Sequence, residues 1–196
     1  MKRTVFGTLG RIWLGFVASA ILVCAAHAAE KTAFELAKEA DKHVGEDAKG
    51  KVVQIRSEKS VGSLTPTIWY VVLYDPDATA KATEVKFGAG QKLSVKRPAR
   101  VLELGFRDHL QLDKDKLKVD SDAAIKTATE QPMLKNLKLT ASKLTLERWE
   151  GQVVWKVRLW AEKLRDSRKD ADIGEIFIAT DSGKVVKNDL KIERVD

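Results

Sequence analysis

The sequence predicts an α+β fold made of two tandem units, each a short helix followed by an antiparallel sheet. Alanine-rich segments with helical spacing occur twice, at 31–44 and 122–128, and strand-like segments follow each of them. The order and spacing of these segments agree between the halves, so that Trp69 in the first aligns with Trp155 in the second. We therefore expect a tandem repeat of one structural unit, with the two sheets either side by side or joined through the segment between the halves.

In the first half, Ala33, Ala37 and Ala40 recur at the spacing of one helix face. The β-rich runs that follow are separated by turn signals at 75–77, which contains proline, and at 88–90, which contains two glycines. The strands expected in this half are 51–58, 68–74, 82–87 and 93–96.

In the second half, Asp120 or Ser121 can cap the helix, and Pro132 limits its length. The apolar residues of 152–162 alternate and include Trp155, which predicts that this side chain is buried in the core. The strands expected in this half are 137–149, 152–162, 173–180 and 184–187.

The last two strands are expected to form a hairpin that turns at Asp181, Ser182 and Gly183. Glycine adopts the positive φ angle that such turns require without the steric cost that a Cβ brings. A longer, charged loop at 163–172 precedes this hairpin and is expected to be solvated.

The first 28 residues have the layout of a secretory signal. An uncharged apolar stretch at 12–24 follows a basic segment that contains Lys2, Arg3 and Arg11. The tripeptide Ala26-His27-Ala28 then gives the small-x-small pattern of a cleavage site. The apolar stretch is shorter than the ~20 residues that span a bilayer. Cleavage after this tripeptide would leave a periplasmic or secreted protein without a membrane span.

A retained N-terminal anchor and lipidation of Cys24 are the alternatives to cleavage. Leu22 and Val23 resemble a lipobox poorly, because the residue before the lipidated cysteine is normally small. An ordinary apolar role for Cys24 is therefore favoured. The predicted organisation is a signal peptide at 1–28, a first unit at 29–98, a connecting segment at 99–119 and a second unit at 120–196.

Charge and cysteine content exclude several classes of function. The signal contains three basic and no acidic residues, so its removal lowers the formal charge from +7 to +4. The remaining charges are interspersed, and basic residues do not alternate with aromatic ones, which argues against nucleic-acid binding. The single cysteine lies in the signal, so we expect neither a disulfide nor a cysteine-ligated metal.

The sequence contains no motif that indicates catalysis. It has neither the His-Glu-x-x-His of zinc peptidases nor the Gly-x-Ser-x-Gly of serine hydrolases. The aspartates at 113, 115, 120 and 122 lack the glycine and the terminal glutamate of a calcium loop. We therefore predict a protein that is not an enzyme and that holds no metal or cofactor.

Three segments of the second half carry a family resemblance: the helix 123–128, the strand 154–159 with its aromatic residue, and the closing hairpin 176–186. Together they resemble the PepSY domain, a small helix-plus-antiparallel-sheet module of exported bacterial proteins. The resemblance covers 120–189, and the first half is a weaker copy. Ala179 stands where the family usually has an acid, and Ser182 replaces the usual threonine.

The resemblance implies a cystatin-like fold and a binding or regulatory role in the bacterial envelope. PepSY relatives occur in peptidase propeptides and in standalone exported proteins, so a protein partner is expected, with a peptidase as a candidate. The alternative is a structural protein, or one that binds a small apolar ligand in the concave face of the sheet. By position on the mixed face and in the charged loop, the candidate contact residues are Lys156, Arg158, Trp160, Arg165 and Arg168.

Overall fold

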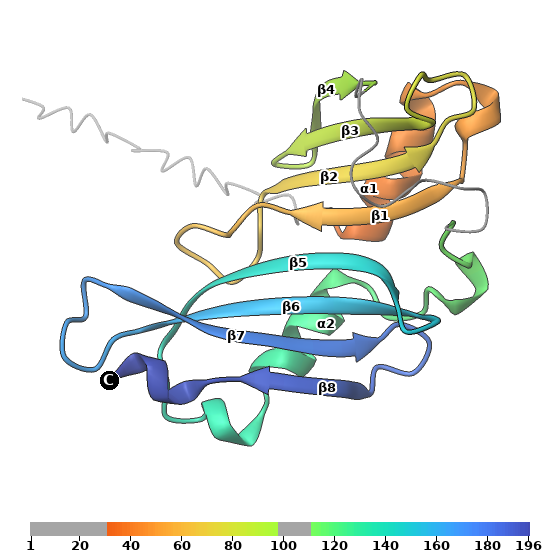
Figure 1. Cartoon of the computed structure of the whole chain (residues 1–196). Coiled ribbons are helices and arrows are strands. Elements are labelled where there is room, and N and C mark those ends of the chain that lie inside the picture. The colour runs from red at the N-terminus through yellow and green to blue at the C-terminus, as the bar shows by residue number, and fades with distance from the viewer. Residues whose placement is uncertain (1–30, 98–110) are drawn as a thin grey trace, which may run out of the picture.

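The computed structural model describes residues 31–97 and 111–196, and the expected signal sequence lies outside them. The described chain forms one antiparallel sheet of eight strands in the order β4-β3-β2-β1-β5-β6-β7-β8, with two α-helices on one of its faces (Figure 1). The helices are α1 (Ala33–Ala40) and α2 (Ser121–Thr129). The strands are β1 (Val52–Ser57), β2 (Ile68–Tyr74), β3 (Ala82–Gly88), β4 (Gln91–Lys96), β5 (Leu139–Trp149), β6 (Gln152–Glu162), β7 (Asp170–Ala179) and β8 (Val185–Leu190).

The prediction of two tandem helix-plus-sheet units is wrong, because all eight strands belong to one sheet. β1 and β5 are antiparallel neighbours in its middle, with Arg56 opposite Thr145. Beside this ladder the Leu144 N–H donates to the Ser57 hydroxyl oxygen at 2.9 Å. A first strand at the edge of a separate sheet would expose unpaired backbone groups, and pairing β1 with β5 satisfies them. We call this junction the seam.

The main core lies between the helices and the sheet and draws on both halves of the chain. Trp155 is fully buried at its centre, as the alternation of 152–162 predicts. Its ring stacks on Phe34 of α1 at a centroid distance of 6.1 Å and meets Trp69 of β2 edge-on at 6.4 Å. The indole N–H donates to the Val119 carbonyl at 2.8 Å, so the polar atom of this buried ring is satisfied.

The N-termini of the two helices meet at Asp120, the N-cap of α2. The carboxylate Oδ1 of Asp120 accepts hydrogen bonds from Ser121 N at 2.6 Å and from Phe34 N at 3.1 Å. The Ser121 hydroxyl oxygen accepts a bond from Ala33 N at 3.0 Å. α1 also has a capping box of its own, built on Thr32. One acidic side chain thus stabilises the positive ends of both helices.

Of the two loops that flank β7, the one after the strand contains the predicted turn residues and the one before it is shorter than predicted. The β7–β8 loop contains Asp181, Ser182 and Gly183, and the glycine has a φ of +71°. Its N–H donates to the Ala179 carbonyl at 2.8 Å. The charged loop before β7 is shorter than the sequence suggested and spans 163–169, because β7 begins at Asp170.

Candidate functional site

The face of the sheet opposite the helices carries charged and aromatic side chains, and we call it the helix-free face. The strand register aligns seven of its residues in one row that runs from β3 to β8. The row crosses the seam, so both halves contribute to a single surface. In order, it consists of Lys86, Tyr70, Arg56, Thr145, Lys156, Phe177 and Lys187.

Cations lie over both aromatic rings of this row. The Tyr70 ring has the Arg56 guanidinium at 4.4 Å and the Lys86 ammonium at 5.0 Å from its centroid. The Phe177 ring is flanked in the same way by the two lysines of β6 and β8, at 5.4 and 5.1 Å. Because each such contact is worth about 0.5–1 kcal/mol at an exposed site, the row is held in a defined arrangement.

On the N-terminal side of the seam two acids of this face are paired with cations. Glu58 accepts hydrogen bonds from the Tyr70 hydroxyl and, at 3.1 Å, from the Lys86 ammonium, and together these hold the pKa of Glu58 below its usual range. Arg56 Nη2 pairs with a carboxylate oxygen of Glu84 at 2.6 Å. Both acids are thus paired, whereas Lys96, which lies opposite Glu84 in the β3–β4 ladder, has no ion pair among the described residues.

The Arg56 guanidinium nevertheless has an unsatisfied N–H. Its Nη1 is buried and has no hydrogen-bond acceptor among the residues that the structure describes. A buried donor without a partner costs about 1–3 kcal/mol. An acceptor brought within reach of this atom, beside the seam, would therefore be stabilising.

On the C-terminal side, two cations of the face are paired with acids. Lys156 pairs with Glu147 at 3.0 Å, and Arg158 pairs with Glu175 at 2.7 Å and with Asp172 at 3.7 Å. The hydrogen bond to Glu175 raises the pKa of Arg158 above its ordinary value.

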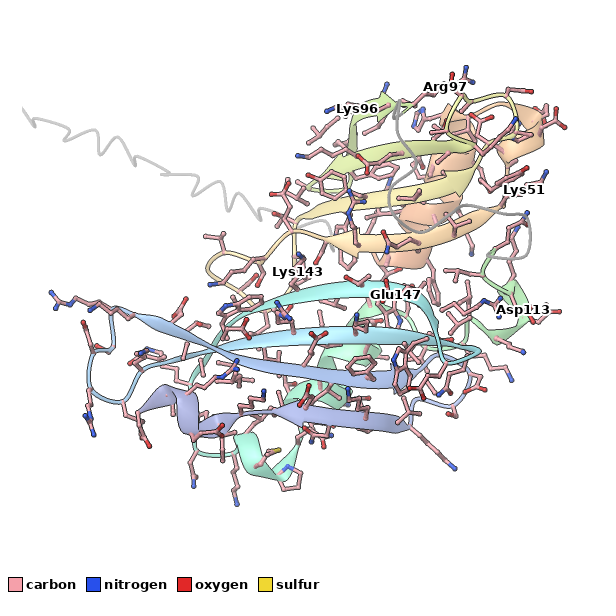
Figure 2. The ribbon with its side chains drawn as sticks, in the orientation of Figure 1. Lys51, Lys96, Arg97, Asp113, Lys143 and Glu147 are labelled. Carbon is pink, nitrogen blue, oxygen red and sulfur yellow. The ribbon has the colours of Figure 1, made fainter. Side chains whose placement is uncertain are left out.

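A depression of about 220 Å³ lies beside the seam, and we call it the seam depression; it is lined by Lys143, Thr145, Lys156, Arg158 and Glu175. Lys143 of β5, labelled in Figure 2, lies directly opposite Arg158 in the β5–β6 ladder. Like charges in directly opposed positions repel each other. Lys156 and Arg158 have acids as partners, whereas Lys143 has no ion pair within 31–97 and 111–196, so Lys143 carries the uncompensated charge of this lining.

Three of the predicted contact residues share the helix-free face. Lys156 and Arg158 line the seam depression. Trp160 is half-buried on the same strand, and the Lys59 ammonium lies 4.7 Å from its ring centroid. The alternation in 152–162 was therefore sufficient to group these three side chains.

The structure does not bring the two predicted loop arginines to this lining. Arg165 and Arg168 are exposed in the loop between β6 and β7. Arg168 Nε is paired within that loop with Asp166 at 3.1 Å. Proximity in sequence to β6 was a poor guide here, because the loop extends away from the middle of the strand.

Sequence reasoning missed Lys143, Thr145 and Arg56 as parts of the site. A signal for the first two existed, because Leu144 and Leu146 alternate with them and are fully buried on the other face. No comparable signal existed for Arg56. Its place beside the depression depends on the pairing of β1 with β5.

The described residues give no sign of a metal centre or of a helix that could span a membrane. Within 31–97 and 111–196, no three His, Cys, Asp or Glu side chains are grouped so as to hold a metal ion. None of the helices in these ranges combines the length and hydropathy that a bilayer crossing requires.

Comparison with known proteins identifies a similar fold but no family. No family model matches the chain, and no curated protein is similar to it. Among solved structures the chain is similar to the crystal structure of "a putative lipoprotein" from Clostridium difficile 630, with a TM-score of 0.50 and 16% sequence identity. The alignment covers 79% of this chain and 88% of that one. Identity this low shows a shared fold, and the resemblance to PepSY domains stays a prediction.

Proposed function

We propose that this chain is a non-enzymatic binding protein of the bacterial envelope that holds a protein partner against its helix-free face. The observation that carries the proposal is the seam depression, where Lys143, which has no ion pair within 31–97 and 111–196, lies directly opposite the cationic Arg158. An acidic side chain from a partner would offset this repulsion, and such complementarity gives an interface its specificity.

The pairing of the other charges favours a protein over a polyanion as the partner. Acids accompany the cations on both sides of the seam, as in the pairs of Arg56 with Glu84 and of Lys156 with Glu147. A polyanion would meet these acids as well as the cations. A protein surface of mixed charge suits such a face, and aromatic and arginine side chains are enriched in protein interfaces.

The expected signal sequence supports a place for this protein outside the cytoplasm, in the periplasm or secreted. A peptidase is the first partner class to test, because the resemblance to PepSY domains implies restraint of peptidases. In such a complex the partner would meet the face as a largely preformed surface, since its aromatic rings are already covered by cations.

The test is differential capture from an envelope extract after mild crosslinking, with residues 29–196 as bait. A Lys143→Glu bait places an acid where the proposal requires a cation. It should lose at least about tenfold of the partner recovered by the unchanged bait. Trp160→Ala should weaken capture less, because Trp160 lies outside the depression.

Lys126→Glu is the matched control, since Lys126 is exposed on α2, on the other side of the sheet. Capture that falls equally with both glutamate variants would reflect general charge and would contradict the proposed face. Circular dichroism of each bait confirms that the variants are folded.

A second candidate function is the binding of a small ligand. The core fills most of the helix-covered face of the sheet. The observation that favours a small ligand is a groove at the edge of this face, beside α1.

A further inference from the structure

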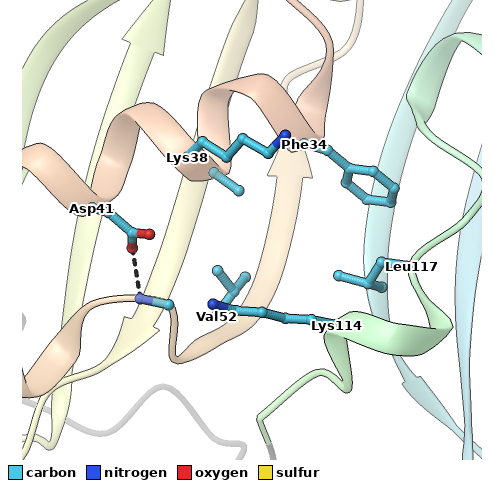
Figure 3. Close-up of a pocket in the computed structure, with 8 residues that line it drawn as sticks. Phe34, Lys38, Asp41, Val52, Lys114 and Leu117 are labelled. Atoms are coloured by element: carbon cyan, nitrogen blue, oxygen red, sulfur yellow. Dashed lines mark hydrogen bonds between the residues drawn. The ribbon is translucent and has the colours of Figure 1, made fainter.

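A groove of about 260 Å³ lies between α1, the start of β1 and the short 3₁₀ helix η4 (Lys114–Lys116). It is on the helix side of the sheet and is separate from the seam depression. Figure 3 shows Lys38 and Lys114 extended along its two sides, with Phe34 and Leu117 at one end. Its full lining is Phe34, Ala37, Lys38, Asp41, Gly50, Val52, Lys114 and Leu117.

The floor of the groove is apolar and well supported. Phe34 stacks on the buried Trp155, and Val52 is only 7% exposed. The Val52 carbonyl accepts a 2.8 Å hydrogen bond from Leu112 N, which ties the segment leading to η4 to the edge of β1. An apolar ligand would therefore meet a preformed surface rather than one that has to be ordered on binding.

The rim carries two lysines without an ion pair in the described ranges, Lys38 and Lys114. The one acid of the lining, Asp41, accepts a 2.7 Å hydrogen bond from Gly50 N (Figure 3). Two cations and one acid leave the groove with one uncompensated positive charge. A ligand with a single negative charge would balance it.

Gly50 brings one of these cations to the floor. A Cβ at this residue would meet the Lys114 ammonium, so a larger residue would displace the end of this flexible side chain. Its φ of +69° is also unfavourable for other residues. The groove thus combines an apolar floor with a positive charge that lies beside Gly50.

We propose that this groove binds a short aliphatic carboxylate, with the chain on Phe34, Val52 and Leu117 and the carboxylate between Lys38 and Lys114. The volume lies just below the ~300 Å³ at which small-molecule sites usually begin, which favours a short chain over a full-length lipid. This inference is independent of the protein partner proposed for the helix-free face.

The test is a titration of ¹⁵N-labelled residues 29–196 with octanoate, followed by NMR at the amides of Gly50 and Leu117. Saturable shifts confined to the groove are expected. The uncharged 1-octanol, which has the same chain length, should bind about tenfold more weakly because it lacks the charge that the lysines attract.

The double variant Lys38→Gln/Lys114→Gln should lose about tenfold in octanoate affinity. Lys116→Gln is the matched control, since Lys116 belongs to η4 but not to the lining. Ala37→Leu should abolish binding by filling the groove, while leucine preserves the helix.

Four results would overturn the inference. Octanol could bind as tightly as octanoate, the double variant could bind as the parent does, or the shifts could spread over the surface without saturating. The fourth is equal binding of octanoate by the parent and by Ala37→Leu.

Discussion

The two halves of the sheet contain the same order of elements but differ in strand length and in what they give to the core. β1 to β4 have six or seven residues each, whereas β5, β6 and β7 have ten or eleven. The C-terminal half also supplies Trp155, whose ring contacts Phe34 and Trp69 of the other half. From this difference we expect the C-terminal half to be the scaffold and the N-terminal half to be stabilised by docking onto it.

The largest expected effect is that of Trp155→Ala. Truncating a fully buried tryptophan costs about 3–5 kcal/mol, and this one also leaves the Val119 carbonyl without its donor. Because the ring joins both halves, the whole sheet should lose stability in one urea transition. Circular dichroism in the far and near ultraviolet should then report the same midpoint.

Trp69→Ala sharpens the comparison between the halves. Trp69 is 3% exposed, and its indole N–H donates to the Pro66 carbonyl at 2.8 Å within the N-terminal half. Native-state hydrogen exchange should become faster in β2 and β3 and change little in β6. Equal acceleration in β6 would show that the N-terminal half does not open separately from the C-terminal half in the native state and would contradict the scaffold role.

Asp120→Ala is expected to have the next largest effect. Asp120 caps α2 and also binds Phe34 N in the first turn of α1, so its loss should cost about 2 kcal/mol. Thr32→Ala removes a cap from α1 alone and should cost about 1 kcal/mol. Chemical denaturation of both variants measures the difference. Equal losses would mean that Asp120 contributes nothing to α1.

Local pattern was enough to find most strands, because alternation is a property of neighbouring residues. The segment 152–162 predicts β6 to the residue and the burial of Trp155. The pairing of Arg56 with Thr145 could not be derived in this way. Two amphipathic sheets with free edges and one continuous sheet have the same alternation, and only the contacts across the seam distinguish them.

The same limit applied to the candidate site and the helix ends. Lys156, Arg158 and Trp160 were grouped correctly because they share one face of one strand. The missing ion pair of Lys143 and the reach of Asp120 to α1 depend on segments far apart in the sequence.

Acid should weaken the N-terminal half through Asp75, at the turn between β2 and β3. Burial alone would raise the pKa of this 2% exposed carboxyl, but hydrogen bonds from Thr83 Oγ1 and Asp77 N, with Arg97 at 3.4 Å, hold the pKa below its ordinary value. A lowered folded-state pKa gives stability that is present above the unfolded value of about 3.9 and is lost as pH falls through the folded value.

Asp75→Asn should therefore reduce stability near pH 7 and flatten its decline below pH 4, as measured by urea midpoints across that range. Asp166 offers a comparison in the other half. Hydrogen bonds from Arg168 lower the pKa of Asp166 too, but that pair lies in an exposed loop. Asp166→Asn should therefore change the loss of stability below pH 4 much less. If stability falls below pH 4 as steeply in Asp75→Asn as in the parent, Asp75 is not the cause of that loss.

The smallest expected effects come from the closing hairpins of the two halves. The β3–β4 turn places Ala89 at φ +46° and Gly90 at +74°, a two-residue turn in which the first position prefers asparagine or glycine. Ala89→Asn should therefore stabilise the protein by about 0.5 kcal/mol.

Gly183→Ala in the β7–β8 loop should cost about 1 kcal/mol, because alanine is strained at φ +71° and its Cβ would lie 3.4 Å from Val119. If the strained turn is in the N-terminal half and the relaxed turn in the C-terminal half, thermal unfolding should show a raised Tm for Ala89→Asn and a lowered Tm for Gly183→Ala. If Ala89→Asn destabilises the protein, the β3–β4 turn is not a source of strain. The stability of the N-terminal half would then depend on its contacts with the C-terminal half.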